Sequence, residues 1–287
     1  MTVKIFESPA LHLGLALVIS LAPGISLAQN ANLGSESGLD RDMQQKAVKP
    51  VDLGPTSDKR VKVNKAEESA YKEFLAAQNG DAATRIRLGE DFAAKFPTSN
   101  YLPGVYAVLT SSYFATGNSD KMFSAGNRAI QLDPSNVDVM SLLAMAIPRR
   151  VKATSPDGAQ QLQAAEVYAR RAIEIIPTTT KPPAVDDAAF EKAKNDKLAL
   201  AHSGLGLIDI GQKKYEDARA ELAQAVQLAS NPDPVDYYLL GNADVQASYF
   251  KEAVAAYQKC AAFGPLMAQC AARAESAQHD AETKPGR

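Results

Sequence analysis

Histidine is the side chain best suited to acid–base chemistry near neutral pH, and it occurs three times in this chain. His12 lies in an apolar N-terminal stretch, His279 lies near the C-terminus, and His202 falls at a packing position of a helical pattern. Catalytic triads and metal sites need several such groups at suitable spacings, and the sequence offers none. It also has no glycine-rich phosphate loop. We therefore expect no catalytic residue, no metal and no cofactor, and we predict that the protein is not an enzyme.

Thiol chemistry is the second possibility, because the chain has two cysteines. Cys260 and Cys270 lie five residues before and after Pro265, which belongs to a predicted Gly264-Pro265 turn. Two antiparallel helices that meet at this turn would bring the two sulfurs face to face, so a disulfide is geometrically reasonable. It would contribute roughly 2–3 kcal/mol by closing a short loop. The alternative is two separate thiols in the core.

Charge gives little guidance to a partner. The chain has 31 basic and 33 acidic residues and a net charge of −2, so we expect no bulk attraction to nucleic acid or anionic lipid. One basic cluster, residues 149–152, lies in a segment (148–158) that we predict to be a long turn. This cluster is either a docking point for an acidic partner or simply a solvated loop.

The N-terminus has the pattern of a secretory signal peptide. Residues 13–22 form a short apolar run, followed by Pro23-Gly24 and by the small residues Ser26 and Ala28 before a predicted cleavage site. The run is too short to span a bilayer. We therefore predict a periplasmic or secreted protein with no stable membrane anchor after cleavage.

The rest of the chain must supply the fold, and small residues recur in it at a fixed period. Gly206 and Gly241 are 35 residues apart, and so are Ala218 and Ala253. Each glycine occupies the eighth place of a repeat and each alanine the twentieth, which we expect to be where two helices of a hairpin touch. Large residues at other places would fill the space between hairpins.

Earlier segments follow the same template less closely. Predicted hairpins begin near residues 64, 103, 137, 199 and 234, and a last helix over 266–278 would cap the stack. The chain thus divides into a signal peptide (1–28), a flexible leader (29–63), a helical repeat domain (64–280) and a polar tail (281–287).

This pattern resembles the tetratricopeptide repeat family, whose unit is a helix–turn–helix of about 34 residues. The resemblance is most specific in the last two repeats and implies an all-α solenoid of antiparallel helical hairpins. Place 11 departs from the family pattern, because it holds Asp209 in one repeat and Asp244 in the next. Either the helix register is shifted there or the two aspartates face a polar pocket.

The resemblance also implies a partner-binding groove lined by the first helix of each hairpin. The corresponding residues are Ala107, Ser111, Phe114, Ser141, Met145, Ser203, Leu207, Ile210, Tyr238, Asn242, Val245 and Gln246. This set is mildly apolar with small polar groups, which suits an extended segment or a helix laid in a groove.

The resulting hypothesis is an exported scaffold that binds an unknown protein or peptide partner in this groove. The alternative is a periplasmic enzyme, or a regulatory subunit of an envelope enzyme, with a site in the loops 148–160 and 177–196. The lack of histidine and cysteine in those loops argues against the alternative.

Overall fold

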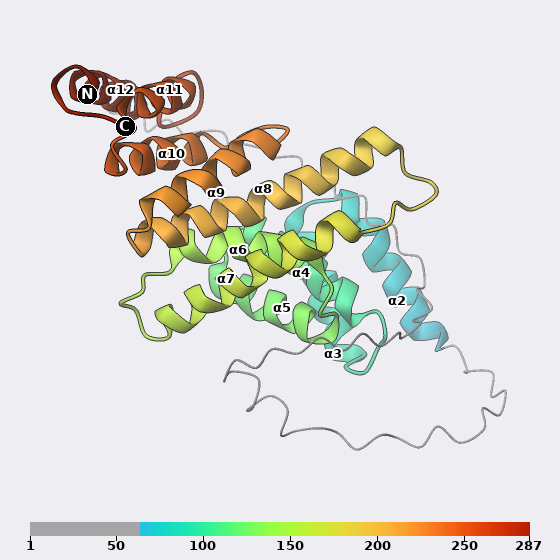
Figure 1. Ribbon diagram of the computed structural model, residues 1–287. Coiled ribbons are helices and arrows are strands. Elements are labelled where there is room, and N and C mark those ends of the chain that lie inside the picture. Colours follow the sequence, from blue (N-terminus) through green and yellow to red (C-terminus); the bar gives the residue numbers. More distant parts are fainter. Residues whose placement is uncertain (1–63) are drawn as a thin grey trace, which may run out of the picture. The chain divides into compact units, whose positions relative to one another are not determined.

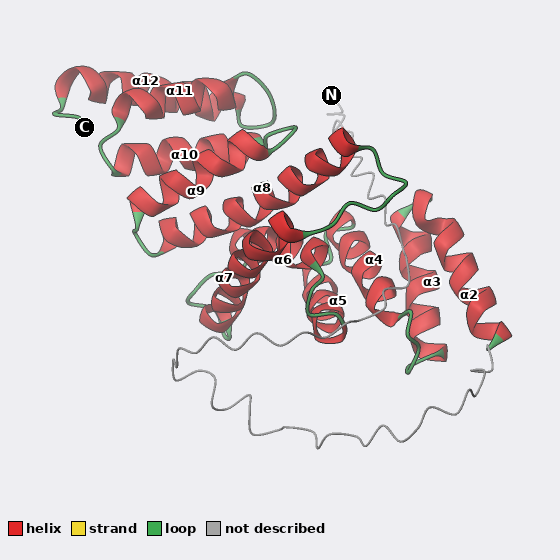
Figure 2. Cartoon of the chain, turned by 45° about the vertical axis from the view of Figure 1, so that its right-hand side comes forward, coloured by secondary structure: helices red, strands yellow, loops and turns green. Residues whose placement is uncertain are grey.

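A computed structural model describes residues 64–287 of the chain. The predicted signal peptide and leader lie outside the described residues. Within 64–287 the structure has eleven α-helices and two short 3-10 turns, and no strand (Figure 2). Residues 64–287 lie within one compact unit. The prediction of an all-α fold is confirmed for this part of the chain.

The helices follow the predicted hairpins closely. They are α2 (Lys65–Ala76), α3 (Ala82–Lys95), α4 (Leu102–Ala115), α5 (Ser119–Leu132), α6 (Val137–Arg150), α7 (Gly158–Ile175), α8 (Asp187–Gly211), α9 (Tyr215–Leu228), α10 (Pro234–Gln246), α11 (Phe250–Ala261) and α12 (Met267–Thr283).

Five helical hairpins stack in chain order, and α12 completes the stack (Figure 1). The two helices of each hairpin contact each other, and each hairpin contacts the next one along the chain. A hairpin cannot bury its apolar face alone, so the stacked neighbours supply its core. The described residues therefore form the solenoid of antiparallel hairpins that the repeat template predicts.

Local sequence explains where most helices begin. The side chains of Asn64, Asp81, Asn118, Asn136 and Asp186 each accept a hydrogen bond from a backbone N–H in the first turn of the following helix. Such N-caps satisfy amide groups that the helix itself leaves without partners. At α10 the cap and a proline act together, as predicted from Asp233 and Pro234.

Glycines at the eighth place of a repeat allow close packing, but against a different residue than predicted. A β-carbon added at Gly206 would lie 2.5 Å from Cγ of Leu222, and one at Gly241 would lie 2.7 Å from the Tyr257 ring. Leu222 and Tyr257 occupy the twenty-fourth place, whereas the prediction paired the glycines with the alanines at place 20. Each glycine thus makes room for a large side chain of the second helix.

The segment predicted as a long turn at 148–158 is shorter than expected. Helix α6 continues to Arg150, and the loop before α7 spans only residues 151–157. Pro148 lies inside the helix, in the last turn of α6. Since proline has no N–H, it cannot donate to the carbonyl of Ala144, four residues earlier. Gly204 of α8 approaches this same carbonyl, where an added β-carbon would lie 2.6 Å from the Ala144 carbonyl carbon.

The last helix is longer than predicted and is attached to its neighbour. Helix α12 runs to Thr283, so residues 281–283 of the predicted polar tail are helical. A disulfide joins Cys260 of α11 to Cys270 of α12, with a Cα–Cα distance of 5.8 Å, and both residues are fully buried. After α12 the backbone N–H of Arg287 donates to the carbonyl of Ser248 at 3.0 Å.

Candidate functional site

Three of the predicted groove residues are not at the surface. Ser141, Met145 and Ser203 are 0%, 6% and 1% exposed, respectively. All three lie where α6 and α8 approach each other, at the contact that Gly204 makes possible. We therefore leave them out of any partner-binding surface.

Three further members of the predicted set, all on α10, are engaged with the helices that follow. The Tyr238 hydroxyl accepts a hydrogen bond from the Gln269 amide of α12 at 2.9 Å. The amide oxygen of Asn242 accepts one from the Tyr257 hydroxyl at 2.7 Å. Val245 packs against the apolar cluster between α11 and α12. This face of α10 is thus largely covered by the end of the stack.

The remaining predicted residues are dispersed over three helices. Ile210 packs on the cluster between α9 and α10, and Phe114 of α4 is 36% exposed. The others in this group are Ala107, Ser111, Leu207 and Gln246, which are half-buried or exposed. Partner binding by this group stays a prediction.

Arg149, the first residue of the basic cluster at 149–152, lies in a helix and joins helices together instead of lying in a loop. Arg149 extends from the last turn of α6 to two carboxylates, with its guanidinium 2.6 Å from Asp233 and 2.7 Å from Asp236. It also donates to the Ser203 hydroxyl at 3.0 Å, and that hydroxyl donates to Asp236 at 2.7 Å. One arginine thereby links α6 and α8 to the start of α10. The interpretation of this residue as a solvated loop side chain or a docking point was wrong.

Burial controls the chemistry of this cluster. Asp236 is only 8% exposed, and burial raises its pKa above the ordinary value even though Arg149 opposes the shift. Breaking such a pair leaves an uncompensated buried charge, which is strongly destabilising. The cluster therefore fixes how three helices stack and is not free to bind a ligand.

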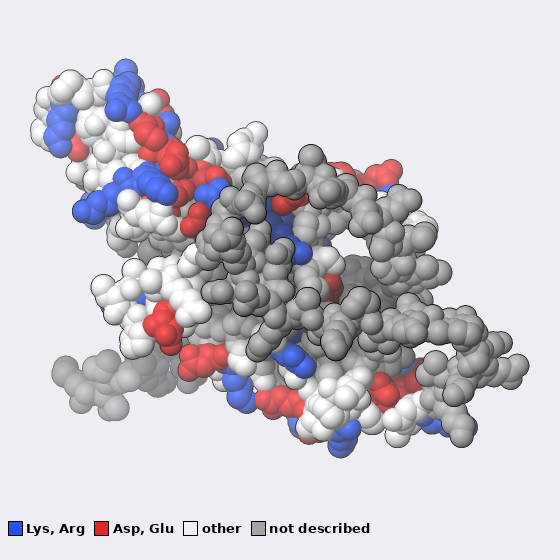
Figure 3. All heavy atoms as spheres, turned by 60° about the horizontal axis from the view of Figure 1, so that its bottom comes forward, with Lys and Arg blue, Asp and Glu red and all other residues white. Residues whose placement is uncertain are grey.

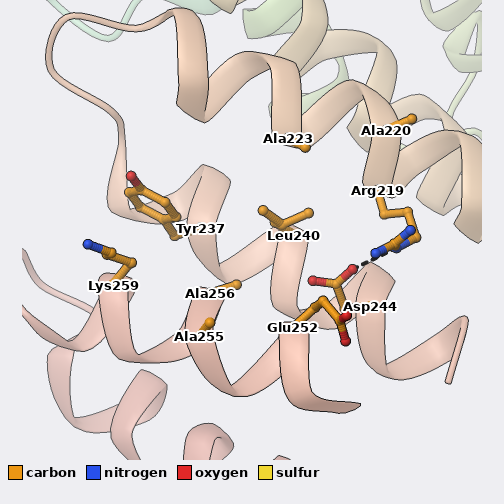
Figure 4. Close-up of a pocket in the computed structure, with 10 residues that line it drawn as sticks. All are labelled: Arg219, Ala220, Ala223, Tyr237, Leu240, Asp244, Glu252, Ala255, Ala256 and Lys259. Atoms are coloured by element: carbon orange, nitrogen blue, oxygen red, sulfur yellow. Dashed lines mark hydrogen bonds and ion pairs between the residues drawn. The ribbon is translucent and has the colours of Figure 1, made fainter. Parts of the chain in front are cut away.

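A groove lies instead between the second helices of the last two hairpins, with α10 as its floor (Figure 4). Its volume is about 390 Å³. It is lined by Arg219, Ala220 and Ala223 of α9, by Tyr237, Leu240 and Asp244 of α10, and by Glu252, Ala255, Ala256 and Lys259 of α11. The middle of the groove is apolar, because alanines form both walls and Leu240 lies between them.

One end of the groove holds an ion pair. Nε of Arg219 donates to Oδ1 of Asp244 at 2.8 Å, and the guanidinium carbon lies 3.5 Å from the centre of the Tyr249 ring. Asp244 is 2% exposed, and its burial raises the carboxyl pKa to about 6 although Arg219 lowers it. Asp244 therefore faces a polar site, and a register shift does not explain its place in the repeat.

The other end of the groove is aromatic and basic. Tyr237 and Lys259 lie together at this end in Figure 4. The Tyr237 ring meets Phe263 edge to face, with the ring centres 6.5 Å apart. Phe263 is 40% exposed and Met267, four residues later, is 49% exposed.

Each repeat that precedes a wall of the groove has larger side chains at the equivalent positions. Counted from the buried alanine at place 20, Ala220 and Ala223 correspond to Val167 and Arg170 of α7. In the same way, Ala256 corresponds to Glu221. The groove is thus lined by smaller side chains than those at the equivalent places one repeat earlier.

Glu221 of α9 is itself in contact with a histidine of α8. Nδ1 of His202 lies 2.6 Å from Oε2 of Glu221, so the histidine that was predicted to be a packing residue contacts a carboxylate. Neighbouring Asp209 is 8% exposed, and burial raises its pKa to about 6, with Glu166 and Glu221 contributing in the same direction. In the last repeat, Arg219 supplies the cation that pairs with Asp244. The equivalent position one repeat earlier is Glu166, so Asp209 lacks the equivalent cation.

The loops considered for an enzyme site contain few reactive groups. Within residues 64–287, no group of three or more His, Cys, Asp or Glu side chains is arranged to hold a metal ion. The loop before α8 is held by an ion pair between Lys181 and Asp187 at 2.8 Å. Among the described helices, none is long and apolar enough to cross a membrane.

Charge on the surface is mixed in sign. On the face shown in Figure 3, acidic and basic side chains of the coloured residues are interspersed. Any selectivity for a charged partner on this face must therefore come from individual side chains, since neighbouring opposite charges weaken each other's field at a distance.

No family model matches the chain, and no curated protein matches it either. Solved structures do resemble it. A thermophilic TPR protein from Thermus thermophilus is 18% identical, with 74% of this chain and 99% of that chain covered and a TM-score of 0.46. PilW, described as a widely conserved type IV pilus biogenesis factor, is 13% identical over 77% of this chain and 93% of its own, with a TM-score of 0.49. At TM-scores below 0.5 these likenesses carry no argument about function.

Proposed function

We propose that this protein is an exported scaffold that binds a segment of another protein. The observation that supports the proposal is the groove between α9, α10 and α11, which is already formed and combines apolar walls with charged ends. Concave apolar sites with a few polar groups are the usual places for ligand binding. The groove replaces the predicted first-helix surface as the primary site.

Export is the second part of the proposal. It rests on the apolar run at residues 13–22 followed by small residues before a predicted cut after Ala28. The disulfide between Cys260 and Cys270 agrees with an oxidising compartment. Fractionation of the source cells and N-terminal sequencing test this part. We expect a mature chain that begins at Gln29, and an unprocessed chain in the cytosol would refute it.

Site-specific photo-crosslinking in the source cells tests partner binding. A photoreactive amino acid replaces Ala223, which is exposed and lines the groove, or Ala94 of α3, which is exposed and distant in sequence. We expect one protein to be crosslinked at about the stoichiometry of the scaffold from position 223 and not from position 94. If the same proteins are captured from both positions, or none from 223, the proposed function fails.

A further inference from the structure

We propose that the groove between α9, α10 and α11 receives a short amphipathic helix of the partner protein, which lies antiparallel to α9 and α11. This inference rests on the proposed function and specifies the chemistry of the bound segment. Three features support it: the walls of the groove, the charges at its ends and the direction of the flanking helices.

The walls favour a helix over an extended segment. Every wall is an α-helix, whose backbone groups are already hydrogen-bonded within the helix, so an extended peptide would find few partners for its own N–H and C=O groups. A helix satisfies those groups itself and can bring a ridge of side chains into the groove. Helices that bind in such grooves contact them through the i, i+3, i+4 and i+7 positions of an apolar face.

The wall of α11 has this same spacing. Glu252, Ala255, Ala256 and Lys259 occupy positions i, i+3, i+4 and i+7, which span about 10 Å or two helical turns. The alanines of this wall leave a space, and so do Ala220 and Ala223 on the facing helix. Large side chains of the bound segment must fill that space. The bound helix should therefore present two large apolar side chains, such as leucine, between two polar ends.

Charges at the two ends define those polar residues. Arg219 is engaged by Asp244 at 2.8 Å and by Glu216 at 3.9 Å. Glu252 and Lys259 form no ion pair with another residue of the described part of the chain, and they stand at opposite ends of the groove (Figure 4). A complementary segment carries a basic residue toward Glu252 and an acidic residue toward Lys259.

Helix direction follows from these charges. Both α9 and α11 begin near the Glu252 end and run toward the Lys259 end. A helix prefers acidic residues in its first turn and basic residues in its last turn, because of its dipole. A bound helix with its first turn at Lys259 and its last turn at Glu252 satisfies this preference and both charge contacts. It then lies antiparallel to both walls.

The probes are two synthetic, fluorescently labelled helical peptides of about 14 residues in an alanine- and glutamine-rich background. The first has glutamate, two leucines and lysine at positions i, i+3, i+4 and i+7, and the second has glutamine in place of both the glutamate and the lysine. Fluorescence anisotropy measures binding to the full mature protein. We expect the first peptide to bind wild type about five- to tenfold more tightly than the second, since each charge contact contributes a few tenths to one kcal/mol.

Variants of the groove make the test specific. The double variant Glu252→Gln with Lys259→Gln should remove most of the difference between the two peptides. Ala223→Gln should weaken the first peptide about tenfold by filling the groove, whereas the control Ala94→Gln should leave its affinity unchanged; both alanines are exposed, so neither variant should disturb folding.

Equal affinity of the two peptides, binding that Ala223→Gln does not weaken, or no binding of either up to about 1 mM would each overturn this inference. The crosslinking experiment separates that result from failure of the proposed function. A partner crosslinked at position 223 together with failed peptides removes only the helix proposal, whereas no crosslinked partner at 223 removes the scaffold function itself.

Discussion

Replacing Gly204 by alanine should destabilise the protein more than any other single methyl group added to α8. The added β-carbon would lie 2.6 Å from the carbonyl carbon of Ala144 and 3.1 Å from the amide nitrogen of Met145. These are backbone atoms of α6 and cannot rotate away, so α6 and α8 must separate. The contact buries Ser141 and Ser203 as well, so separation of the helices also exposes polar groups that are now enclosed.

The magnitude follows from two opposing effects. Alanine is better than glycine in a helix by up to about 1 kcal/mol, whereas overpacking at a rigid contact costs about 1–3 kcal/mol. Forced separation of two packed helices removes further apolar contacts. We therefore expect a net loss of about 2 kcal/mol, the upper end of the overpacking cost less the helix gain, which for a unit of this size lowers the melting temperature by about 4–8 °C.

Thermal and urea unfolding followed by circular dichroism at 222 nm measure the effect. Gly211→Ala in the same helix is the matched control, because no atom lies within 4 Å of its added β-carbon. It should be neutral or stabilising by up to about 1 kcal/mol. Gly206→Ala should fall between the two, since the atom it meets belongs to the movable Leu222 side chain at 2.5 Å. If Gly204→Ala is as stable as Gly211→Ala, the close approach of α6 and α8 is wrong.

Four further predictions concern stability. Burial raises the pKa of Asp209 from 3.8 to about 6, so the wild type loses stability as pH rises from about 4 to about 6. Asp209→Asn removes this loss and should gain on the order of 1–3 kcal/mol above pH 6 and little at pH 4, measured by urea unfolding across that range. Lys213 has a φ of 61°, so Lys213→Gly should stabilise by up to about 1 kcal/mol, and a loss in a thermal melt would contradict the left-handed turn. Arg149→Met should cost about 3–5 kcal/mol in denaturant, because it leaves the buried Asp236 carboxylate without a cation, and an unchanged midpoint would show that the cluster is solvated. Replacing both Cys260 and Cys270 by alanine should cost roughly 2–3 kcal/mol, and a reductant should destabilise the wild type but not this variant.

The hairpins were predictable because their signals are local. Caps such as Asp233, turn residues and the spacing of small residues each depend on one short segment, and the structure uses them as expected. The turn at Gly117, which has a φ of 73°, recurs at Lys213 and at Ser248, where the sequence offers no glycine to indicate it. Periodicity alone therefore identified the last two turns.

The binding surface was harder to predict because it depends on how one hairpin sits on the next. The template assigns place 5 of a first helix to an open groove, and Ser141 and Ser203 occupy that place. Both are buried, because Pro148 frees a carbonyl of α6 and Gly204 lets α8 approach it. Pro148 and Gly204 are distant in sequence, and no local pattern links them.

A signal for the observed groove was present in the sequence but was not used. Second helices usually cover their exposed sides with polar residues, yet α9 and α11 carry exposed alanines at Ala220, Ala223 and Ala255. Alignment of the repeats places Val167 and Arg170 at the first two of these positions one repeat earlier. Comparison between repeats of a single chain would thus have shown that these helices carry unusually small side chains at the groove positions.

The floor of the groove is held from two sides, which bears on how tightly it can bind. At the start of α10, Arg149 fixes Asp233 and Asp236 at 2.6 and 2.7 Å. On another face of α10, Tyr238 is hydrogen-bonded to α12, and α12 is itself joined to α11 by the disulfide. Tyr237, Leu240 and Asp244 project from the third face into the groove. Because α10 is fixed before any partner arrives, little conformational entropy of this chain is lost on binding, and most of the ordering cost falls on the partner segment. A partner segment that is already helical before it binds should therefore bind most tightly.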